Sequence, residues 1–373
     1  MVIAIVCYPT YGGSGVVATE LGLELSKRGH EIHFITYNQP VKLDLFNNNI
    51  HYHEVIVPDY PLFHYKPYEL ALSSKIVETV KEYNIDILHV HYAIPHAYAA
   101  YMSKQMLKTN NINIPIVTTL HGTDITLVGS HPYYKTAVEF SINQSDAVTS
   151  VSKDLKNDTN KFFNINKEIT VIPNFVDLDK YDHKHEDCDR SILAQEDEKI
   201  ITHISNFRKV KRIDDIIKSF DLINKKVKSK LIMLGDGPER IMAENLCNKL
   251  NLNNKVLFLG ASNDTTKILC LSDIFILASE TESFGLVALE AMASFVPVIS
   301  TNSGGIPEVN IDGFSGYLSN VGDINQMSEN AINLLSDPET LSKFKKNANI
   351  QAKKFDVHNV VPFYENVYKK VLK

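Results

Sequence analysis

The sequence predicts an α/β protein built from two doubly wound parallel sheets of the Rossmann type. Short apolar runs alternate with helical patterns from one end of the chain to the other, and this alternation is typical of βαβ units. The chain has 373 residues, which is too long for one ordinary core and suits two domains. Its 44% hydrophobic and 22% charged residues are typical of a folded globular protein.

Apolar runs of strand length divide into two series. The first series is residues 2–7, 31–37, 51–57, 85–91, 114–121 and 147–151, and the second is 200–205, 230–234, 255–259, 274–278 and 296–300. A charged, proline-free stretch separates them, so we predict domains at 1–170 and 171–355. Ligands bind at the carboxyl ends of such strands, which predicts a cleft between the two sheets. A final helical pattern covers 356–373.

Composition excludes several classes of function. The formal charge of −6 leaves no basic footprint for nucleic acid. No run approaches 18 apolar residues, and the N-terminus lacks the charged start of a signal peptide, so we predict a cytoplasmic protein without a membrane partner. Four scattered cysteines without C-x-x-C spacing suggest neither a disulfide framework nor a zinc cage. Cys7 is predicted to be a packed core thiol, and a homo-oligomer is compatible with this sequence.

The stretch 279–293 carries the strongest functional signal. An apolar run leads into a tight turn, and a helix is expected from about Phe284 to Ala293. The first amides of a helix lack intrahelical acceptors and carry partial positive charge, so an anion binds there. Gly285 lets that anion approach, and Glu282 and Glu290 flank it with acceptors for sugar hydroxyls. These residues predict a sugar-nucleotide site, although two glutamates on a solvated helix face remain the alternative.

The segment from Glu282 to Glu290 resembles the E-x7-E motif of the retaining GT-B glycosyltransferases of family 4. The resemblance implies a GT-B fold, with the first glutamate on the donor sugar and the second on the ribose. It implies that the C-terminal helix 356–373 crosses back to pack on the N-terminal domain. The predicted contacts to the nucleotide around the turn are Ser283, Phe284, Gly285 and Leu286.

A glycine-rich loop, Pro9-Thr-Tyr-Gly-Gly-Ser-Gly15, follows the first strand. It lacks the G-x-G-x-x-G spacing, and the second strand ends without an acid for a ribose, which argues against an NAD enzyme. Glycines before a helix still favour close approach of phosphate or carboxylate. The resemblance places Gly13, Ser14 and Gly15 under the donor diphosphate and beside the acceptor. A tight turn without a ligand is the alternative.

Two further groups are candidates for catalysis. His121 ends a strand and resembles the family histidine that contacts the donor sugar, so we predict a positioning residue and not a base. A structural histidine is the alternative. The basic run 208–212 could stabilise charge on a departing diphosphate, although such runs are more often a solvated face. Lys211 matches the family lysine, whereas Arg208 lies three residues before it and the usual spacing is five.

The remaining motifs are weaker. Gly235, in the turn Gly-Asp-Gly-Pro, resembles the family loop beside the nucleotide, with a plain turn as the alternative, and the glycines of 303–308 are taken as structural. The pairs His51/His53 and His89/His91 each share a strand face and could bind a metal, but no third ligand is evident. We therefore expect packed histidines, solvated turns at the D-x-D triplets 177–179 and 187–189, and no metal or other cofactor.

The whole chain resembles the branch of family 4 that glycosylates L-malate in bacillithiol synthesis, especially in the segments VCYPTYGGSGVVATELG, HVHYAIPHA, TTLHGTDIT and ISNFRKVKRIDD. The resemblance implies transfer of N-acetylglucosamine from UDP-GlcNAc to the malate hydroxyl with retention, in which the leaving diphosphate takes the proton. Candidate residues for malate are Ser14, Lys66, Tyr92 and Thr123. Three alternatives stay open: a transferase with another small or lipid acceptor, a UDP-GlcNAc epimerase of the same architecture, and a non-catalytic binding protein.

Overall fold

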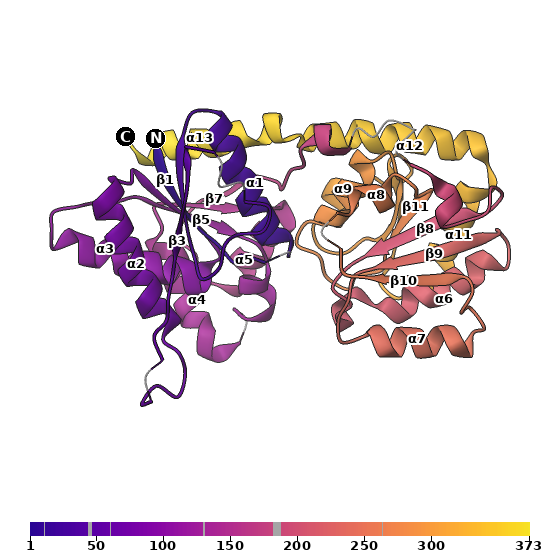
Figure 1. Cartoon of the computed structure of the whole chain (residues 1–373), viewed down its shortest axis with the longest axis horizontal. Helices are drawn as coiled ribbons and strands as arrows, with labels where there is room; N and C mark the ends of the chain where they lie inside the picture. The colour runs from indigo at the N-terminus through magenta and orange to yellow at the C-terminus, as the bar shows by residue number, and fades with distance from the viewer. Residues whose placement is uncertain (11, 44–46, 60, 130, 182–187, 263) are drawn as a thin grey trace. The chain divides into compact units, whose positions relative to one another are not determined.

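The chain forms two compact units in a computed structural model (Figure 1). The structure describes residues 1–10, 12–43, 47–59, 61–129, 131–181, 188–262 and 264–373. The first unit is Met1–Asn174 together with His358–Lys373, and the second unit is Phe175–Val357. The sequence analysis put the change at 170/171 and the final crossing at 356, within a few residues of this division.

The first unit is built on a seven-stranded sheet of order β3-β2-β1-β4-β5-β6-β7. All neighbouring strands pair in parallel, as the alternating pattern predicts. Its strands are β1 (Val2–Val6), β2 (Glu31–Thr36), β3 (Ile50–Glu54), β4 (Ile87–His91), β5 (Ile116–Leu120), β6 (Ala147–Ser150) and β7 (Ile169–Val171). The sequence analysis missed β7, which has only three residues and is buried at only one of them.

Helices cover the first sheet. They are α1 (Gly13–Lys27), α2 (Tyr68–Tyr83), α3 (Tyr98–Lys108), α4 (Pro132–Gln144), α5 (Lys153–Phe162) and α13 (Val357–Val371), with π-helical turns at Ala93–Ala97 and Thr123–Leu127. The C-terminal helix α13, yellow in Figure 1, packs on this unit. Its Tyr368 is fully buried, and the hydroxyl lies 2.7 Å from Nδ1 of His89 on β4. At the same surface His30 Nε2 lies 2.9 Å from Oε1 of Glu365.

The second unit is built on a six-stranded parallel sheet of order β10-β9-β8-β11-β12-β13. Its strands are β8 (Lys199–Ile204), β9 (Ser229–Leu234), β10 (Val256–Gly260), β11 (Ile274–Leu277), β12 (Val298–Thr301) and β13 (Gly316–Ser319). Its helices are α6 (Ile213–Asn224), α7 (Arg240–Lys249), α8 (Thr266–Leu269), α9 (Leu286–Ala293), α10 (Ile306–Val309), α11 (Ile324–Ser336) and α12 (Pro338–Ala352), with 3₁₀ turns at Leu178–Tyr181, Arg190–Ile192, Lys209–Lys211 and Lys353–Phe355. The strand β13 was not predicted.

The apolar face of α6 shows what holds the second unit together. Ile216, Ile217 and Phe220 are fully buried in one cluster with Leu231 and Met233 of β9. Burying a side chain of this size contributes about 1.5–3 kcal/mol relative to leaving it in water. The core therefore fixes the strands that carry the loops at their carboxyl ends.

Both sheets change direction at one place. The chain winds outward from β1 to β3 and then returns to β4 beside β1, and likewise from β8 to β10 and then to β11 beside β8. At such a switch point the loops after two neighbouring strands diverge and leave a crevice for a ligand. The loops after β1 and β4, and those after β8 and β11, are therefore the places to look for function.

The cysteines require one correction. Cys188 and Cys270 form a disulfide, although they lie 82 residues apart in the sequence. Their spacing carries no signal, because only the fold brings the segment before Arg190 beside the end of α8. Cys7 and Cys247 are free and buried, which confirms the prediction for Cys7. Among the described residues, none of the helices is both long enough and apolar enough to cross a bilayer.

Candidate active site

An acid and a cation meet at the switch point of the second sheet. Glu282 follows β11, and Lys211 lies in the 3₁₀ turn after β8. The Lys211 ammonium forms an ion pair with Oε1 of Glu282, and the Ser279 hydroxyl donates to the same oxygen at 2.9 Å. Both partners are largely buried, with side-chain exposures of 19% and 16%. The fold thus joins two of the predicted catalytic residues, and Ser279, which the sequence analysis missed, orients the acid.

Two glycines of the neighbouring loop hold the turn around Glu282. The amide of Gly305 donates to the Glu282 carbonyl at 2.8 Å. Gly304 has φ +61°, and a Cβ at that position would lie 2.0 Å from the same carbonyl oxygen. A Cβ on Gly305 would lie 2.4 Å from the Ser283 carbonyl oxygen. The backbones approach so closely that only glycine fits, which is the structural role predicted for these residues.

The helix α9 presents its amino end at the same place. It begins at Leu286, two residues later than predicted, because Phe284 is buried against Phe355 and Gly285 adopts a left-handed conformation with φ 90°. The N-cap residue is this glycine, which has no side chain to cap the first amides. These N–H groups have no intrahelical acceptor, so they can receive an anion. Glu290 lies in the second turn and is only 9% exposed.

The other two predicted residues of this unit are placed differently. Arg208 is exposed and makes no ion pair within the described part of the chain. Gly235 has φ +126°, and a Cβ there would lie 1.8 Å from the Ser205 carbonyl oxygen. Its amide donates to the Gly260 carbonyl at 2.7 Å. Tight packing alone accounts for Gly235, so its contact to a nucleotide stays a prediction.

The first sheet carries a second set of candidates at its own switch point. Gly13, Ser14 and Gly15 open α1 after β1, and Tyr92 follows β4. The Tyr92 hydroxyl donates to Oγ of Ser14 at 2.5 Å. A Cβ on Gly15 would lie 2.4 Å from the Thr10 carbonyl oxygen, so this turn needs a glycine. The structure therefore unites two of the predicted acceptor residues.

His121 lies at the centre of a buried aromatic cluster. Its Nε2 is 2.8 Å from Nδ1 of His91, and its ring centroid is 5.1 Å from that of Tyr92. Burial lowers the pKa of His121 to about 3, with a further contribution from His96. The ring is neutral at physiological pH and its Nε2 is occupied by His91. This arrangement suits a positioning residue better than a base, and the contact of His121 to a donor sugar stays a prediction.

Asp124 is a buried acid in the loop after β5 that was not singled out from the sequence. It accepts hydrogen bonds from the amides of Ala93 at 2.8 Å and Gly122 at 3.1 Å. Burial raises its pKa to about 6, against the opposing effect of these amides. The carboxylate therefore ties the loops after β4 and β5 together. Asp124 follows Thr123, which is exposed. In the sequence, only its place in the motif His-Gly-Thr-Asp pointed to this acid.

His96 lies in the buried aromatic cluster although it was not predicted, whereas Lys66 was predicted for the acceptor and lies on the surface. His96 is fully buried, its ring lies 4.5 Å from that of Tyr8, and its Nε2 has no partner among the described residues. The sequence analysis did not single out this histidine. Lys66 instead lies on the surface with its Nζ 2.9 Å from Asp59 and a side-chain exposure of 64%. Within the described part of the chain, Lys66 forms no hydrogen bond with Ser14 or Tyr92.

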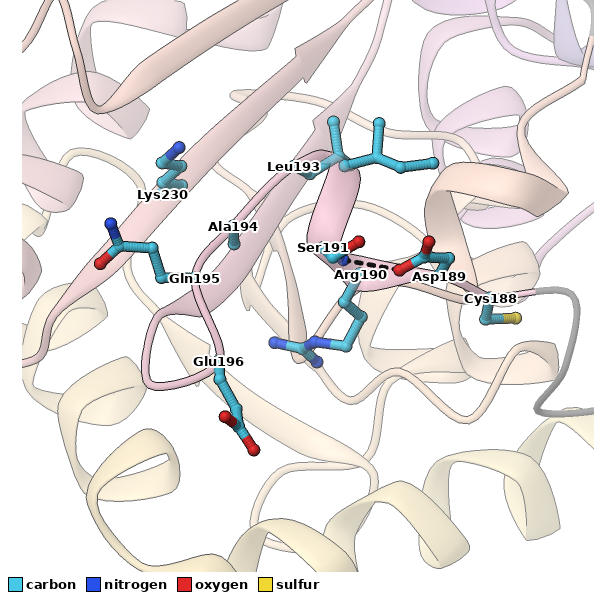
Figure 2. A pocket seen from close by; sticks show the side chains of 10 residues that line it. Cys188, Asp189, Arg190, Ser191, Leu193, Ala194, Gln195, Glu196 and Lys230 are labelled. Atoms are coloured by element: carbon cyan, nitrogen blue, oxygen red, sulfur yellow. Dashed lines mark hydrogen bonds between the residues drawn. The ribbon is translucent and has the colours of Figure 1, made fainter.

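A cavity of about 710 Å³ lies elsewhere in the second unit (Figure 2). It is lined by residues 188–196 and by Lys230 near the start of β9, at the amino end of the sheet. Arg190 is held by Asp273 at 2.7 Å, and Asp189 accepts from the Ser191 amide at 2.9 Å. Asp189 is thus a turn residue, as predicted for its D-x-D triplet, while Asp187 lies outside the described residues.

The buried histidines predict that the first unit loses stability in acid. Burial lowers the pKa of His89 and His121 to about 3 and that of His96 to about 4, from 6.5. The contribution of these histidines to the free energy of unfolding is therefore complete above pH 6.5. It is lost as the pH falls toward 3–4, by up to about 1.4 kcal/mol per pH unit for each residue. Asp124 has the opposite effect, because its pKa is raised from 3.8 to about 6. Between these pH values its contribution to the free energy of unfolding is lost as the pH rises.

Hydrogen exchange of the β4 and β5 amides at pH 7.5 and 5.5, corrected for the intrinsic pH dependence, measures this loss. The control is the pair β8 and β9, because His203 is the one described histidine of the second unit, with its pKa lowered to about 4. Equal losses in both units would contradict the prediction.

Comparisons with known proteins agree with this geometry. Residues 11–180 match the model described as Glycosyltransferase Family 4, and residues 185–351 match that described as Glycosyl transferases group 1. Over 373 residues the chain is 47% identical to N-acetyl-alpha-D-glucosaminyl L-malate synthase of Bacillus anthracis, covering 100% of this chain and 97% of that protein. The chain belongs to the family 4 glycosyltransferases.

A more distant relative and two solved structures are also similar to this chain. The chain is 27% identical to alpha-monoglucosyldiacylglycerol synthase of Streptococcus pneumoniae over 79% of this chain and 68% of that protein. Among solved structures, Anabaena HepE, crystallised with UDP-glucose, has a TM-score of 0.83 at 20% identity and covers 99% of this chain and 100% of its own. Sucrose-phosphate synthase of Thermosynechococcus elongatus has a TM-score of 0.82 at 20% identity, with 100% and 99% covered. These likenesses show that the glycosyltransferase has a GT-B fold.

Proposed function

We propose that this glycosyltransferase moves N-acetylglucosamine from UDP-GlcNAc to the hydroxyl of L-malate, with retention of the α configuration and release of UDP. The observation that carries the proposal is the 47% identity to the Bacillus anthracis synthase over the whole chain. The two switch-point sites support it, because one offers groups for a sugar nucleotide and the other offers donors for a small polar acceptor.

The second-sheet site, which consists of Lys211, Ser279, Glu282, the amino end of α9 and Glu290, would hold the donor. The free amides of α9 suit the diphosphate. Glu290 suits the ribose, because a carboxylate accepts hydrogen bonds from two vicinal hydroxyls. Glu282 suits the donor sugar, and Lys211 is held beside it by their ion pair.

The first-sheet site, which consists of Gly13, Ser14, Tyr92, His121 and Thr123, would hold the acceptor. Malate carries two carboxylates, so it needs N–H and O–H donors. The amino end of α1 supplies backbone amides with a favourable dipole. The hydroxyls of Ser14 and Thr123 supply further donors, and Ser14 is held in place by the hydrogen bond from Tyr92. The neutral ring of His121 would orient the donor sugar.

The reaction needs no protein nucleophile. The malate hydroxyl oxygen would bond to the anomeric carbon on the face from which the diphosphate departs, while the bond from that carbon to the phosphate oxygen breaks. The hydroxyl proton passes to a departing phosphate oxygen, so atoms and charge balance. The protein contributes position and stabilises the negative charge on the leaving group with Lys211 and the α9 amides. No metal is required for these steps.

A coupled assay tests the proposal against its alternatives. Purified protein is incubated with UDP-GlcNAc and with L-malate, a diacylglycerol vesicle, or no acceptor, and UDP and new glycoside are measured together. We expect UDP and glycoside in equal amounts with malate only. Product with the vesicle would indicate a lipid acceptor, turnover without acceptor would indicate an epimerase, and UDP binding without turnover would indicate a binding protein.

Glu290→Gln is expected to weaken UDP binding at least tenfold. A hydrogen bond to a charged acceptor contributes about 1.5–3 kcal/mol, and tenfold in affinity corresponds to about 1.4 kcal/mol. Calorimetric titration with UDP measures the effect. Glu329→Gln, which changes an exposed glutamate on α11 of the same unit, is the matched control. An unchanged affinity of Glu290→Gln for UDP would contradict the assignment of the ribose to this helix.

A further inference from the structure

Four polar side chains gather at the edge of the first sheet, at a place that the transferase reaction does not use. Glu31 and His33 alternate on β2, and His51 and His53 alternate on β3. The two strands are parallel, with His33 opposite His51 and Ile35 opposite His53. Because alternate residues of a strand point to the same face, and paired residues share that face, all four side chains lie on one side of this edge.

The ligand atoms of three of them are close enough to share an ion. His33 Nε2 and His51 Nε2 each lie 3.2 Å from Oε1 of Glu31. All three atoms lie within 4.8 Å of one another. A tetrahedral zinc ion with bonds of about 2.0–2.2 Å holds its ligand atoms roughly 3.3–3.6 Å apart. We propose that Glu31, His33 and His51 form a binding site for a divalent transition-metal ion of the zinc class.

The surroundings of His33 match those of a metal-bound histidine. Its side chain is fully buried, and its other nitrogen, Nδ1, lies 2.8 Å from Nε2 of His53. A metal-binding histidine commonly donates its second N–H to a neighbouring acceptor, which fixes the tautomer and the ring orientation. His53 can accept that proton, so His33 Nε2 keeps its lone pair for the ion. The ring of Tyr83, at the end of α2, packs 4.6 Å from that of His33 and encloses the cluster.

The donor set decides the class of ion. Two imidazoles and one carboxylate favour zinc and its neighbours over magnesium or calcium, which prefer oxygen ligands. The side chains of His51 and Glu31 are 35% and 44% exposed, so the ion can enter and a fourth position stays open to water. The sequence analysis found histidine pairs without a third ligand, because the strand register that adds Glu31 and His33 is not readable from the sequence.

The position predicts a structural role. Glu31 is the first residue of β2, and His51 is the second residue of β3, whereas the first-sheet site lies at the carboxyl ends of the strands. An ion at this edge would tie the outermost strand β3 to β2. Zinc should therefore raise the thermal stability of the first unit and leave the glycosyl transfer unchanged.

Calorimetric titration of the metal-free protein with ZnCl₂ tests the proposal. We expect one equivalent to bind, and Co²⁺ at the same site to show the visible absorption of a tetrahedral complex. His51→Ala and Glu31→Gln remove ligands that are partly exposed, and each should weaken zinc binding by at least a hundredfold. His53→Ala should weaken it by about 10–100-fold, the effect typical of a residue that orients a ligand.

The matched control is His64→Ala, which removes an exposed histidine of the same unit outside the cluster. It should bind zinc like the wild type, and zinc should raise the unfolding temperature of His64→Ala but not that of His51→Ala. No bound equivalent, or equal loss in His64→Ala and His51→Ala, would overturn the proposal. In that case Glu31 only accepts hydrogen bonds from the two imidazoles.

Discussion

Lys211→Ala is expected to lower kcat by about 10²–10³ while the KM for UDP-GlcNAc changes much less. Removing one group that stabilises charge at the transition state has an effect of this size. Lys211 is held at the switch point of the second sheet by its ion pair with Glu282, and only 19% of its side chain is exposed. A largely buried cation acts on the departing diphosphate through a lower dielectric than a solvated one. Steady-state kinetics with UDP-GlcNAc and L-malate measures both constants.

Lys209→Ala is the matched control for Lys211→Ala. Lys209 belongs to the same 3₁₀ turn but is exposed, so its removal should change kcat less than twofold. Glu282→Gln and the double variant complete a cycle, because the ion pair predicts non-additive losses. If kcat is unchanged in Lys211→Ala, or if the whole effect is a rise in the KM for UDP-GlcNAc, Lys211 binds substrate without acting on the leaving group.

Gly304→Ala is expected to destabilise the second unit by about 3 kcal/mol and to abolish tight UDP binding. A left-handed backbone at a residue with a Cβ costs about 1–2 kcal/mol. In addition, the new Cβ would lie 2.0 Å from the Glu282 carbonyl oxygen and 3.2 Å from the Glu282 amide nitrogen. The turn must move to relieve this clash, and Glu282 moves with it. Urea unfolding and UDP titration measure the two effects.

Gly313→Ala separates the two contributions. Gly313 has φ +70°, close to the +61° of Gly304, but a Cβ there would meet no atom within 4 Å. It should therefore lose only the backbone contribution of about 1–2 kcal/mol and should bind UDP like the wild type. Equal destabilisation by both substitutions would mean that the turn around Glu282 can move away from the new Cβ without a cost in stability.

Sequence patterns predicted most of the fold and named several residues of the candidate site. The alternation of apolar runs predicted eleven parallel strands, with bounds within about two residues in most cases. The strands β7 and β13 were not predicted because they have too few buried residues to form a recognisable apolar run. The E-x7-E spacing located Glu282 and Glu290 because both lie on one continuous turn and helix. The basic run 208–212 stood out by its place after a strand, since parallel strands end at the same edge of a sheet, and the resemblance to family 4 selected Lys211 within it.

Apart from Ser279, which donates to the nearby Glu282, the features that sequence reasoning missed depend on partners far along the chain. The disulfide joins residues 82 positions apart, and Asp124 matters because it accepts from the Ala93 amide. The third ligand of the proposed metal site comes from strand register. Such contacts leave no periodic signal, because periodicity reports only what one element presents to its own two faces.

The sequence by itself determined the family, the two parallel sheets and the helix that presents amides between two glutamates, because local periodicity and short motifs encode single elements. The tertiary structure alone decided that Lys211 meets Glu282, that Gly304 must lack a side chain, and that Glu31 joins His33 and His51. These features depend on distances between separate elements, which are set only when the apolar faces of the sheets and helices are buried against one another.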